Sequence, residues 1–304
     1  MIPDHPPAPP GDGHEGTTDL DALRDSLAAG RPLVGSAVTT LSRLLAEADP
    51  AATEDSLAAL PAVRALDVYR TLIAWAPIVA GEKVLDVGCG SGGATRAAAE
   101  AVGEDGLVIG VDHAANAVAM AERRTPDDLP VLYRVARAER LEGLPDRGFD
   151  AAICSLLLDQ MDDLGPTLVE IARVLRPGGR LVASVMDWDR LRPADGPFMG
   201  SLLAVVARHA PGAFAGRASR ATIPDEPLDA AAFRDAGFLT PEERDIQLAL
   251  EMPDMERAWA VFGRSGLGGM LDSAGREALR AAIAAHLPRD VYLPIRLLRT
   301  RRPG

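Results

Sequence analysis

Three glycines and two aspartates near residue 90 carry the most specific chemical signal in the sequence. Gly88, Gly90 and Gly93 have the spacing of a dinucleotide-binding loop, in which glycine lets the backbone come close to a ligand. Asp112 stands about 20 residues further on, after the next apolar run, where an acid can bind the hydroxyls of a ribose. Spacing alone therefore makes NAD(H) a hypothesis for the cofactor.

Asp86 weighs against a cofactor that carries a pyrophosphate. Its carboxylate stands just before Gly88 and would repel a phosphate by about 1 kcal/mol or more at ~4 Å, even with water-like screening. S-adenosylmethionine (SAM) has no phosphate and carries an ammonium and a sulfonium, so the same carboxylate attracts it. The two aspartates therefore favour SAM, and NAD(H) stays an alternative.

The elements that must position this loop alternate between strands and helices. Short apolar runs predict seven strands, at residues 83–87, 107–111, 131–135, 150–154, 181–185, about 243–250 and 291–298. Helical patterns separate most of them, which is typical of a Rossmann-like α/β fold with a mostly parallel sheet covered on both faces. Ligands of such sheets bind at the carboxyl ends of the strands, where the glycine loop lies.

The rest of the chain divides by composition. Residues 1–16 are rich in Pro, Gly, His and acids, and they predict a disordered tail. Residues 17–76 show helical spacings of apolar residues without a strand pattern, and they predict a helical cap. Residues 77–304 form the predicted cofactor-binding domain, with a helical insertion at about 188–228.

Four motifs, in this order, resemble the class I SAM-dependent methyltransferases, in the ubiquinone-biosynthesis-like group that acts on small molecules. They are Val84–Gly92 (VLDVGCGSG), Val108–Asp112 (VIGVD), Leu144-Pro145 with Phe149-Asp150, and Arg173–Gly179 (RVLRPGG). The resemblance covers roughly residues 81–185. It implies the fold and SAM as the cofactor, and it leaves the substrate open.

The resemblance also implies a set of cofactor contacts. Gly88, Cys89 and Gly90 pass beneath the methionine part of SAM, Asp86 faces its polar end, and Asp112 binds the ribose hydroxyls. The residues implied around the adenine and the sulfonium are His113, Arg137, Ala138, Glu139, Ser155 and Leu156.

Two departures from the family pattern affect recognition and catalysis. Arg137 stands where the family often has an aspartate that binds the adenine amino group, so that contact falls to the backbone or to Glu139. The segment 158–161 reads LDQM and lacks the histidine pair that many relatives carry there. Any catalysis that uses this pair is therefore not expected.

Candidate catalytic side chains are few. His209 lies in the predicted insertion and Asp159 in the loop after the fourth strand, and each is a candidate general base. A surface histidine and an ordinary polar loop residue are the competing interpretations. Met186 and Trp188, close to the end of the fifth strand, are candidates to line the substrate pocket, with core packing as the alternative. No metal site is predicted.

Charge and cysteine content limit the partners. The chain has 304 residues, a formal net charge of −12 and a pI near 4.9, which disfavours nucleic acid and anionic membranes as partners. Two cysteines are too few for a disulfide scaffold, and together with the lack of a signal or membrane-spanning pattern they predict a cytoplasmic protein. The expected partner is a small-molecule substrate, and a homodimer is left open.

The prediction is therefore a SAM-dependent methyltransferase (EC 2.1.1 type) that acts on a small molecule, as in secondary metabolism. Three alternatives remain. The first is SAM-dependent cyclisation or decarboxylation on the same fold, because function lies in the site and not in the fold. The second is an NAD-dependent dehydrogenase, and the third is a non-catalytic SAM-binding partner.

Overall fold

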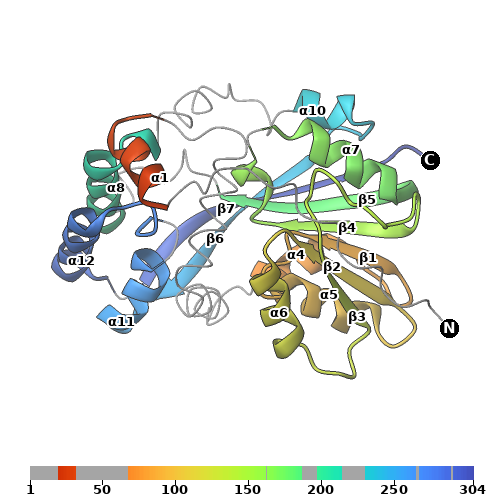
Figure 1. The fold of residues 1–304 in the computed structure, drawn as a ribbon. Helices are drawn as coiled ribbons and strands as arrows, with labels where there is room; N and C mark the ends of the chain where they lie inside the picture. The colour runs from red at the N-terminus through yellow and green to blue at the C-terminus, as the bar shows by residue number, and fades with distance from the viewer. Residues whose placement is uncertain are drawn as a thin grey trace.

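A seven-stranded sheet with the order β3-β2-β1-β4-β5-β7-β6 organises the chain. The computed structural model describes residues 20–31, 68–161, 163–186, 197–213, 230–264, 267–288 and 290–304. The strands are β1 (Lys83–Val87), β2 (Leu107–Asp112), β3 (Val131–Val135), β4 (Phe149–Ser155), β5 (Leu175–Met186), β6 (Glu242–Glu251) and β7 (Asp290–Arg301). Neighbours from β3 to β5 pair in parallel, and β7 runs antiparallel to both β5 and β6 (Figure 1). The predicted α/β fold with a mostly parallel sheet is confirmed.

Alternate residues of the strands face two separate cores. In β1, Val84 packs with α4 (Val68–Trp75) and α5 (Gly93–Val102), whereas Leu85 packs on the opposite face with α7 (Gly165–Val174) and α10 (Ala230–Asp235). Apolar residues on both faces are expected of a strand buried between two layers. Asp86 follows the same alternation and therefore points to the side of α5. A further helix, α6 (Ala115–Arg124), packs against β2 and β3.

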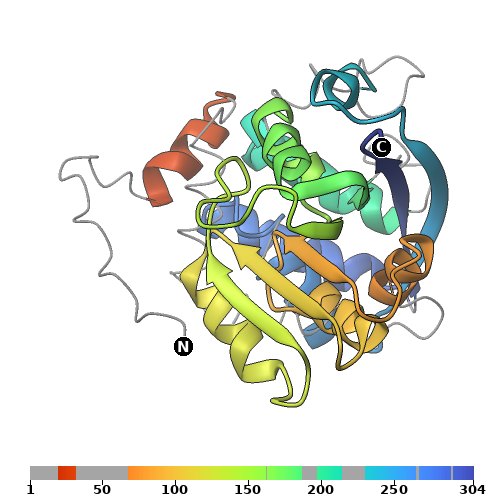
Figure 2. The same cartoon turned by 90° about the vertical axis from the view of Figure 1, so that its right-hand side faces the viewer.

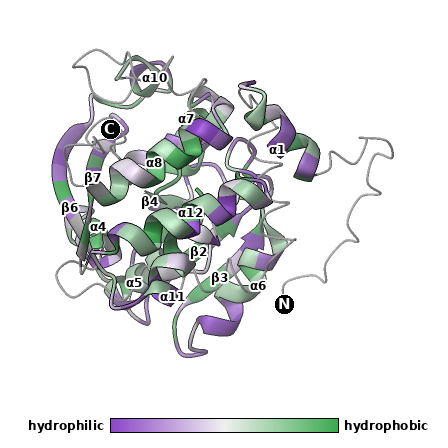
Figure 3. Cartoon of the chain, turned by 90° about the vertical axis from the view of Figure 1, so that its left-hand side faces the viewer, coloured by the Kyte–Doolittle hydropathy of each residue, from purple (hydrophilic) through white to green (hydrophobic). Residues whose placement is uncertain are grey.

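A group of helices, called here the helical lobe, lies beyond the carboxyl ends of the parallel strands (Figure 1). It consists of α1 (Leu20–Ala28), α8 (Pro197–His209), α11 (Met255–Ala258), the π-helical turn η3 (Trp259–Gly263) and α12 (Ser273–His286). Leu23 and Leu27, one turn apart in α1, and Leu279 and Ile283, one turn apart in α12, are buried. Figure 3 views the lobe face on, with α8 beside α12 in front of the sheet.

The amino-terminal helices are only partly described. α1 and α4 fall within the predicted cap, where α1 packs on α8 and α4 packs on α5. The predicted tail, residues 32–67, residues 187–196 and residues 214–229 lie outside the described residues. Among the helices that the structure describes, none combines the length and apolarity that a membrane crossing requires.

The segment Arg176–Gly179 differs from the expectation of a simple turn before the fifth strand. It is part of β5, whose pairing with β4 shifts register between Phe149 and Ala151. Gly178 has a φ of 74°, a backbone conformation that favours glycine. The segment is therefore an irregularity that joins α7 to the sheet within the strand itself.

Candidate cofactor-binding site

The order of the sheet reverses beside β1. The chain runs outward from β1 to β2 and β3, and then crosses to β4 on the other side of β1. Figure 2 shows the two edge strands, β3 and β6, at opposite sides of the molecule. In open α/β sheets, ligands bind outside the carboxyl ends of the strands at such a switch point. The loops after β1 and β4 are therefore where a cofactor site is expected.

The glycine loop after β1 is enclosed by side chains at three of its glycines. A Cβ added at Gly88 would lie 2.9 Å from Leu157, one at Gly92 2.3 Å from the Tyr133 hydroxyl, and one at Gly93 2.4 Å from the ring of Tyr69. Such distances are too short for a side chain, so glycine lets these elements pack directly on the loop. These contacts come from α4, β3 and the loop after β4, and they fix the shape of the loop.

Gly90 is the exception, because a Cβ there would meet no atom within 4 Å. Its φ is 52°, and its backbone N–H donates to Asp112 Oδ2 at 2.9 Å. The N–H groups of Gly88 and Cys89 donate to the carbonyl of Val111 at 2.8 and 2.9 Å, which ties the loop to β2. A ligand can therefore approach the backbone at Gly90, while the neighbouring residues hold the loop in place.

Asp86 is fully buried beneath this loop. The hydroxyl of Thr95, in the first turn of α5, donates to Asp86 Oδ2 at 2.6 Å, and Asp86 Oδ1 is buried without a hydrogen-bond partner. Burial raises the pKa of Asp86 from 3.8 to about 7; nearby Asp112 adds to this rise, and the hydrogen bonds from Thr95 oppose it. Among the described residues, no group therefore donates a hydrogen bond to Asp86 Oδ1.

Asp112 ends β2 and links the glycine loop to the turn that follows β2. Its Oδ2 accepts the Gly90 N–H, and its Oδ1 accepts the N–H of Ala114 at 2.9 Å. A carboxylate can accept about four hydrogen bonds, so each oxygen retains capacity for a ribose hydroxyl. Nδ1 of His113 lies 3.4 Å from Asp112 Oδ1, and its Nε2 is buried without a partner.

The predicted adenine-side residues follow β3. Arg137 and Glu139 form an ion pair at 3.5 Å, with the arginine side chain 53% exposed, and Ala138 packs against the core on the side of α7. The Glu139 carboxylate thus already has a cationic neighbour, and a contact from it to adenine stays a prediction. Cys89, in the loop itself, is a buried thiol whose pKa is raised by burial and by Asp86 and Asp112. It is therefore a neutral packing residue.

The loop after β4 is the second of the two loops at the switch point of the sheet. The N–H of Leu156 donates to the Ser184 carbonyl at 2.8 Å, and the hydroxyls of Ser155 and Ser184 lie 3.3 Å apart, so β5 fixes this loop. Leu156 has a φ of 53°, a strained conformation for a branched residue and one that occurs preferentially at functional sites. Asp159 follows in the short 3-10 turn η1 (Leu158–Gln160) and is half-buried.

The predicted substrate-side residues are distributed between sheet and lobe. Met186 ends β5 and packs, half-buried, against the core that the lobe shares with α4 and α5. His209 ends α8, and its Cβ lies 3.0 Å from where a Cβ on Gly275 would stand, so it borders the first turn of α12. Trp188 lies outside the described residues. The roles of these three residues stay predictions.

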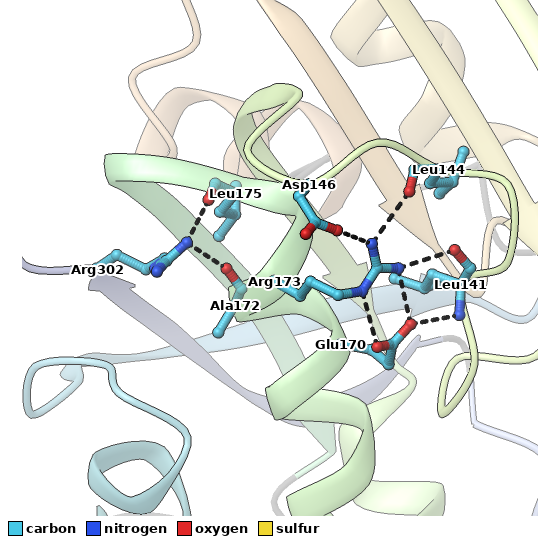
Figure 4. A network of polar contacts seen from close by, with 8 residues as sticks. All are labelled: Leu141, Leu144, Asp146, Glu170, Ala172, Arg173, Leu175 and Arg302. Atoms are coloured by element: carbon cyan, nitrogen blue, oxygen red, sulfur yellow. Dashed lines mark hydrogen bonds and ion pairs between the residues drawn. The ribbon is translucent and has the colours of Figure 1, made fainter.

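Arg173, the first residue of the RVLRPGG motif, holds the segment between β3 and β4, which also contains the predicted adenine-side residues. Its guanidinium donates to the carbonyls of Leu141 and Leu144 at 3.0 and 3.1 Å, and it pairs with Asp146 and Glu170 (Figure 4). These bonds fasten the segment between β3 and β4 onto α7. Arg176 in the same motif donates to Asp150 at 2.5 Å, so the RVLRPGG and FD motifs meet in space.

Comparison with known proteins identifies the domain. Residues 85–183 match the family model described as a methyltransferase domain. A protein of transposon TN4556 from Streptomyces fradiae is 34% identical over 167 residues, and the demethylmenaquinone methyltransferase of Tropheryma whipplei (strain Twist) is 33% identical over 121 residues. These alignments cover 54% and 40% of this chain and 48% of each relative, so the chain spans about half the length of both.

Among solved structures, the [4+2]-cyclase SpnF has a TM-score of 0.53 at 21% identity and covers 90% of this chain and 99% of its own. This similarity shows the fold. Together, the family match, the motifs and the sheet order show that residues 85–183 form a class I SAM-dependent methyltransferase domain.

The side chains at the switch point fit SAM, the cofactor of this domain class. Gly90 leaves space for a ligand, Asp112 retains capacity for two ribose hydroxyls, and Asp86, buried beneath the loop, has one oxygen without a hydrogen-bond partner. A pyrophosphate would be repelled by these acidic groups in their ionised form. The predicted SAM cofactor is thus supported by the site as well as by the family.

Four residues that hold the site were not predicted from the sequence: Tyr69, Thr95, Tyr133 and Leu157. Each contacts the loop or Asp86 from an element that is distant in sequence or, for Thr95, from the following helix. Thr95 alone left a signal, because a hydroxyl among the alanines of the helix after the loop lies within reach of Asp86.

Proposed function

We propose that the protein transfers the methyl group of SAM to a small-molecule acceptor held between the carboxyl ends of β1 and β4 and the helical lobe. The observation that carries this proposal is the open face of Gly90 beside the Asp112 carboxylate, with Asp86 buried beneath the same loop, at the switch point of the sheet. An acidic, phosphate-repelling site with room against a glycine backbone suits a cationic nucleoside cofactor.

In this proposal, SAM supplies an electrophilic methyl group when it is bound. Asp112 binds the ribose hydroxyls, and Asp86 attracts the ammonium of the methionine part, while the glycine loop supports its chain. The strained Leu156 and the Ser155–Ser184 pair border the reacting atoms at the end of β4. Alignment of an acceptor with the methyl group can contribute ~7–11 kcal/mol to lowering the barrier, so positioning by these residues is the main catalytic contribution.

The acceptor class is inferred from the surroundings and the relatives. Leu156 and Met186 pack against the apolar core that continues into the lobe, and this favours an uncharged or weakly charged acceptor. The name of the Tropheryma relative supports a cyclic acceptor of quinone or phenol type. The net charge of −12 argues against nucleic acid as the acceptor, and the two free, buried cysteines fit the proposed cytoplasmic location.

A hydroxyl acceptor would need a base for its proton. His209, at the end of α8, and Asp159, in η1, are the proposed candidates, since one lies in the lobe and the other follows the loop after β4. An amine or an activated carbon would need no such base, and positioning would suffice.

A second candidate function is SAM-dependent chemistry without methyl transfer, such as cyclisation. It is favoured by the match to a [4+2]-cyclase over nine-tenths of the chain, and by the LDQM sequence in place of a histidine pair. In that case the bound cofactor would shape the pocket and would not be consumed.

Mass spectrometry with SAM carrying a CD3 group tests the proposal. The protein is incubated with a panel of quinols, phenols and amines, and both the labelled product and S-adenosylhomocysteine (SAH) are quantified. Equal amounts of CD3-labelled product and SAH would support methyl transfer. Conversion of an acceptor that requires SAM but leaves it intact would establish the second candidate. Tight SAM binding without conversion of any acceptor would instead favour a non-catalytic role.

A further inference from the structure

We propose that cofactor binding is coupled to the ionisation of Asp86, whose buried side chain is a carboxylic acid in the free site and a carboxylate in the occupied site. Thr95 is the positioning residue that sets this balance. The inference rests on the proposed SAM binding and concerns a proton that the reaction itself does not use.

The geometry of Asp86 disfavours a charge in the free protein. The side chain is completely buried and, among the described residues, accepts hydrogen bonds from Thr95 alone, from its hydroxyl at 2.6 Å and from its backbone N–H. Its Oδ1 is buried and has no donor. An ionised carboxylate offers about four acceptor positions, and its transfer out of water without matching donors is costly. Protonation removes this cost, because the neutral acid needs fewer donors.

The charged and titratable groups that face Asp86 do not compensate its charge. Asp112 on β2 repels it, and the thiols of Cys89, in the loop, and Cys154, on β4, are neutral because burial raises the pKa of both. On α5, Arg96 follows Thr95, but its guanidinium donates to the carbonyl of Ser91 at 2.8 Å. Among these neighbours, the only cation is therefore directed at another acceptor.

Thr95 connects Asp86 to a further hydroxyl. Tyr133 on β3 is hydrogen-bonded to Thr125, at 2.8 Å between the oxygens, and its surroundings include the Thr95 hydroxyl. The Tyr133 hydroxyl also packs directly on Gly92. Thr95 thus lies between Asp86 and Tyr133, and Tyr133 in turn packs on the glycine loop. The Thr95 hydroxyl is therefore oriented by packing as well as by its bond to Asp86.

The direction of the pKa agrees with this geometry, since burial and Asp112 raise that of Asp86 to about 7. The ammonium of a bound cofactor supplies the missing opposite charge and favours the ionised form. By linkage, binding near pH 6 releases a proton, because the free acid is mostly protonated there. Binding well above pH 7 releases none from Asp86, because the carboxyl group is already ionised.

Isothermal titration calorimetry with SAH tests this coupling. Titrations in buffers of different ionisation enthalpy give the number of protons released at each pH. We expect the wild type to release close to ~1 proton near pH ~6 and close to none from this group near pH ~8.5. Asp86→Asn should bind SAH without this release, which assigns the proton to Asp86 and not to His113 or the ligand.

Variants of Thr95 test its positioning role. Thr95→Val keeps the shape but removes the donor, so the carboxylate loses its only side-chain hydrogen bond, and the pH of half-maximal proton release should move upward. Thr95→Ser retains the hydroxyl and should restore the wild-type pH. A merely structural role for Thr95 would change stability but leave this pH in place.

The outcomes separate the two proposals. SAH binding by the wild type without proton release, or with equal release by Asp86→Asn, would overturn the coupling and leave the proposed function intact. Should Asp86→Asn fail to bind, the upward shift in Thr95→Val and its reversal in Thr95→Ser decide the question. Failure of the wild type to bind either SAH or SAM would overturn both proposals.

Discussion

The open face of Gly90 leads to a prediction with a matched control elsewhere in the chain. Gly90 and Gly178 both have a positive φ, 52° and 74°, and a Cβ at either position would meet no atom within 4 Å. Alanine at each site therefore bears the same kind of backbone strain, about 1–2 kcal/mol, without a clash in the free protein. We expect both variants to unfold a few degrees below the wild type.

Only Gly90→Ala places a methyl group where the cofactor is proposed to lie. Gly178 lies in the irregular start of β5, at the opposite end of that strand from the site. Forcing a methyl group into a well-packed contact costs about 1–3 kcal/mol, which corresponds to a loss of SAH affinity of roughly 5-fold to 140-fold. Gly178→Ala should bind SAH as the wild type does.

Calorimetric titration with SAH and thermal unfolding without ligand measure the two effects separately. Unimpaired SAH binding by both Gly90→Ala and Gly178→Ala, at similar destabilisation, would refute the proposed position of the cofactor. An equal loss of affinity in both variants would also refute it, because strain alone would then explain the effect. A specific loss in Gly90→Ala locates the cofactor on the open side of the loop.

Four further predictions address single residues. Asp112→Ala should weaken SAM binding by on the order of 1–3 kcal/mol, since ribose hydroxyls lose their acceptor; unchanged affinity in calorimetry would remove Asp112 from the site. Arg173→Ala should lower the free energy of unfolding by about 2 kcal/mol in a urea titration, because two backbone carbonyls and two acids lose their shared donor; an unchanged midpoint would contradict the role shown in Figure 4. Because the folded pKa of Asp86 is raised from 3.8 to about 7, its stabilising contribution is complete below pH ~3.8 and is lost as the pH rises through ~7; the stability difference between wild type and Asp86→Asn should change over that window, and a constant difference would refute the shift. His209→Ala should reduce kcat by ~10²–10⁴-fold with little change in SAM affinity if the acceptor is a hydroxyl, and turnover within a few-fold of wild type at saturating SAM would eliminate His209 as the base.

The fold could be predicted because the apolar runs have a simple physical cause. Parallel strands buried on both faces, such as β1 and β2, are nearly continuous in apolar residues, and α5 between them begins at Gly93 and is followed by Gly103. Sequence alone did not show that the RPGG segment belongs to β5. Its pairing depends on a partner strand that is distant in sequence, which local turn chemistry does not reveal.

The proposed cofactor site could be predicted where the loop itself carries the chemistry. Asp86, Gly90 and Asp112 are near each other through adjacent strands, so a spacing rule identifies them. The enclosing side chains were not predictable. Tyr69 and Tyr133 contact Gly93 and Gly92 only because α4 and β3 fold against the loop, and no spacing in the sequence encodes that contact.

The ionisation state of Asp86 could not be predicted from the sequence either. The residue type suggested a permanent negative charge, whereas complete burial with one hydroxyl donor raises its pKa toward neutrality. Burial is a property of the packed structure, so the charge state of this aspartate follows from the fold and not from the motif. The catalytic side chains are hardest to predict, because the proposed substrate side combines residues of the lobe with residues of the sheet.

The most direct test of the central claim is a comparison of SAM, SAH and NADH as ligands of the wild-type protein by calorimetric titration under one set of conditions. We expect one site for which SAM and SAH compete, and weaker binding of NADH at a pH above ~7, where the ionised Asp86 repels its pyrophosphate. Binding of NADH in preference to SAM, or no binding of SAM at all, would contradict this expectation.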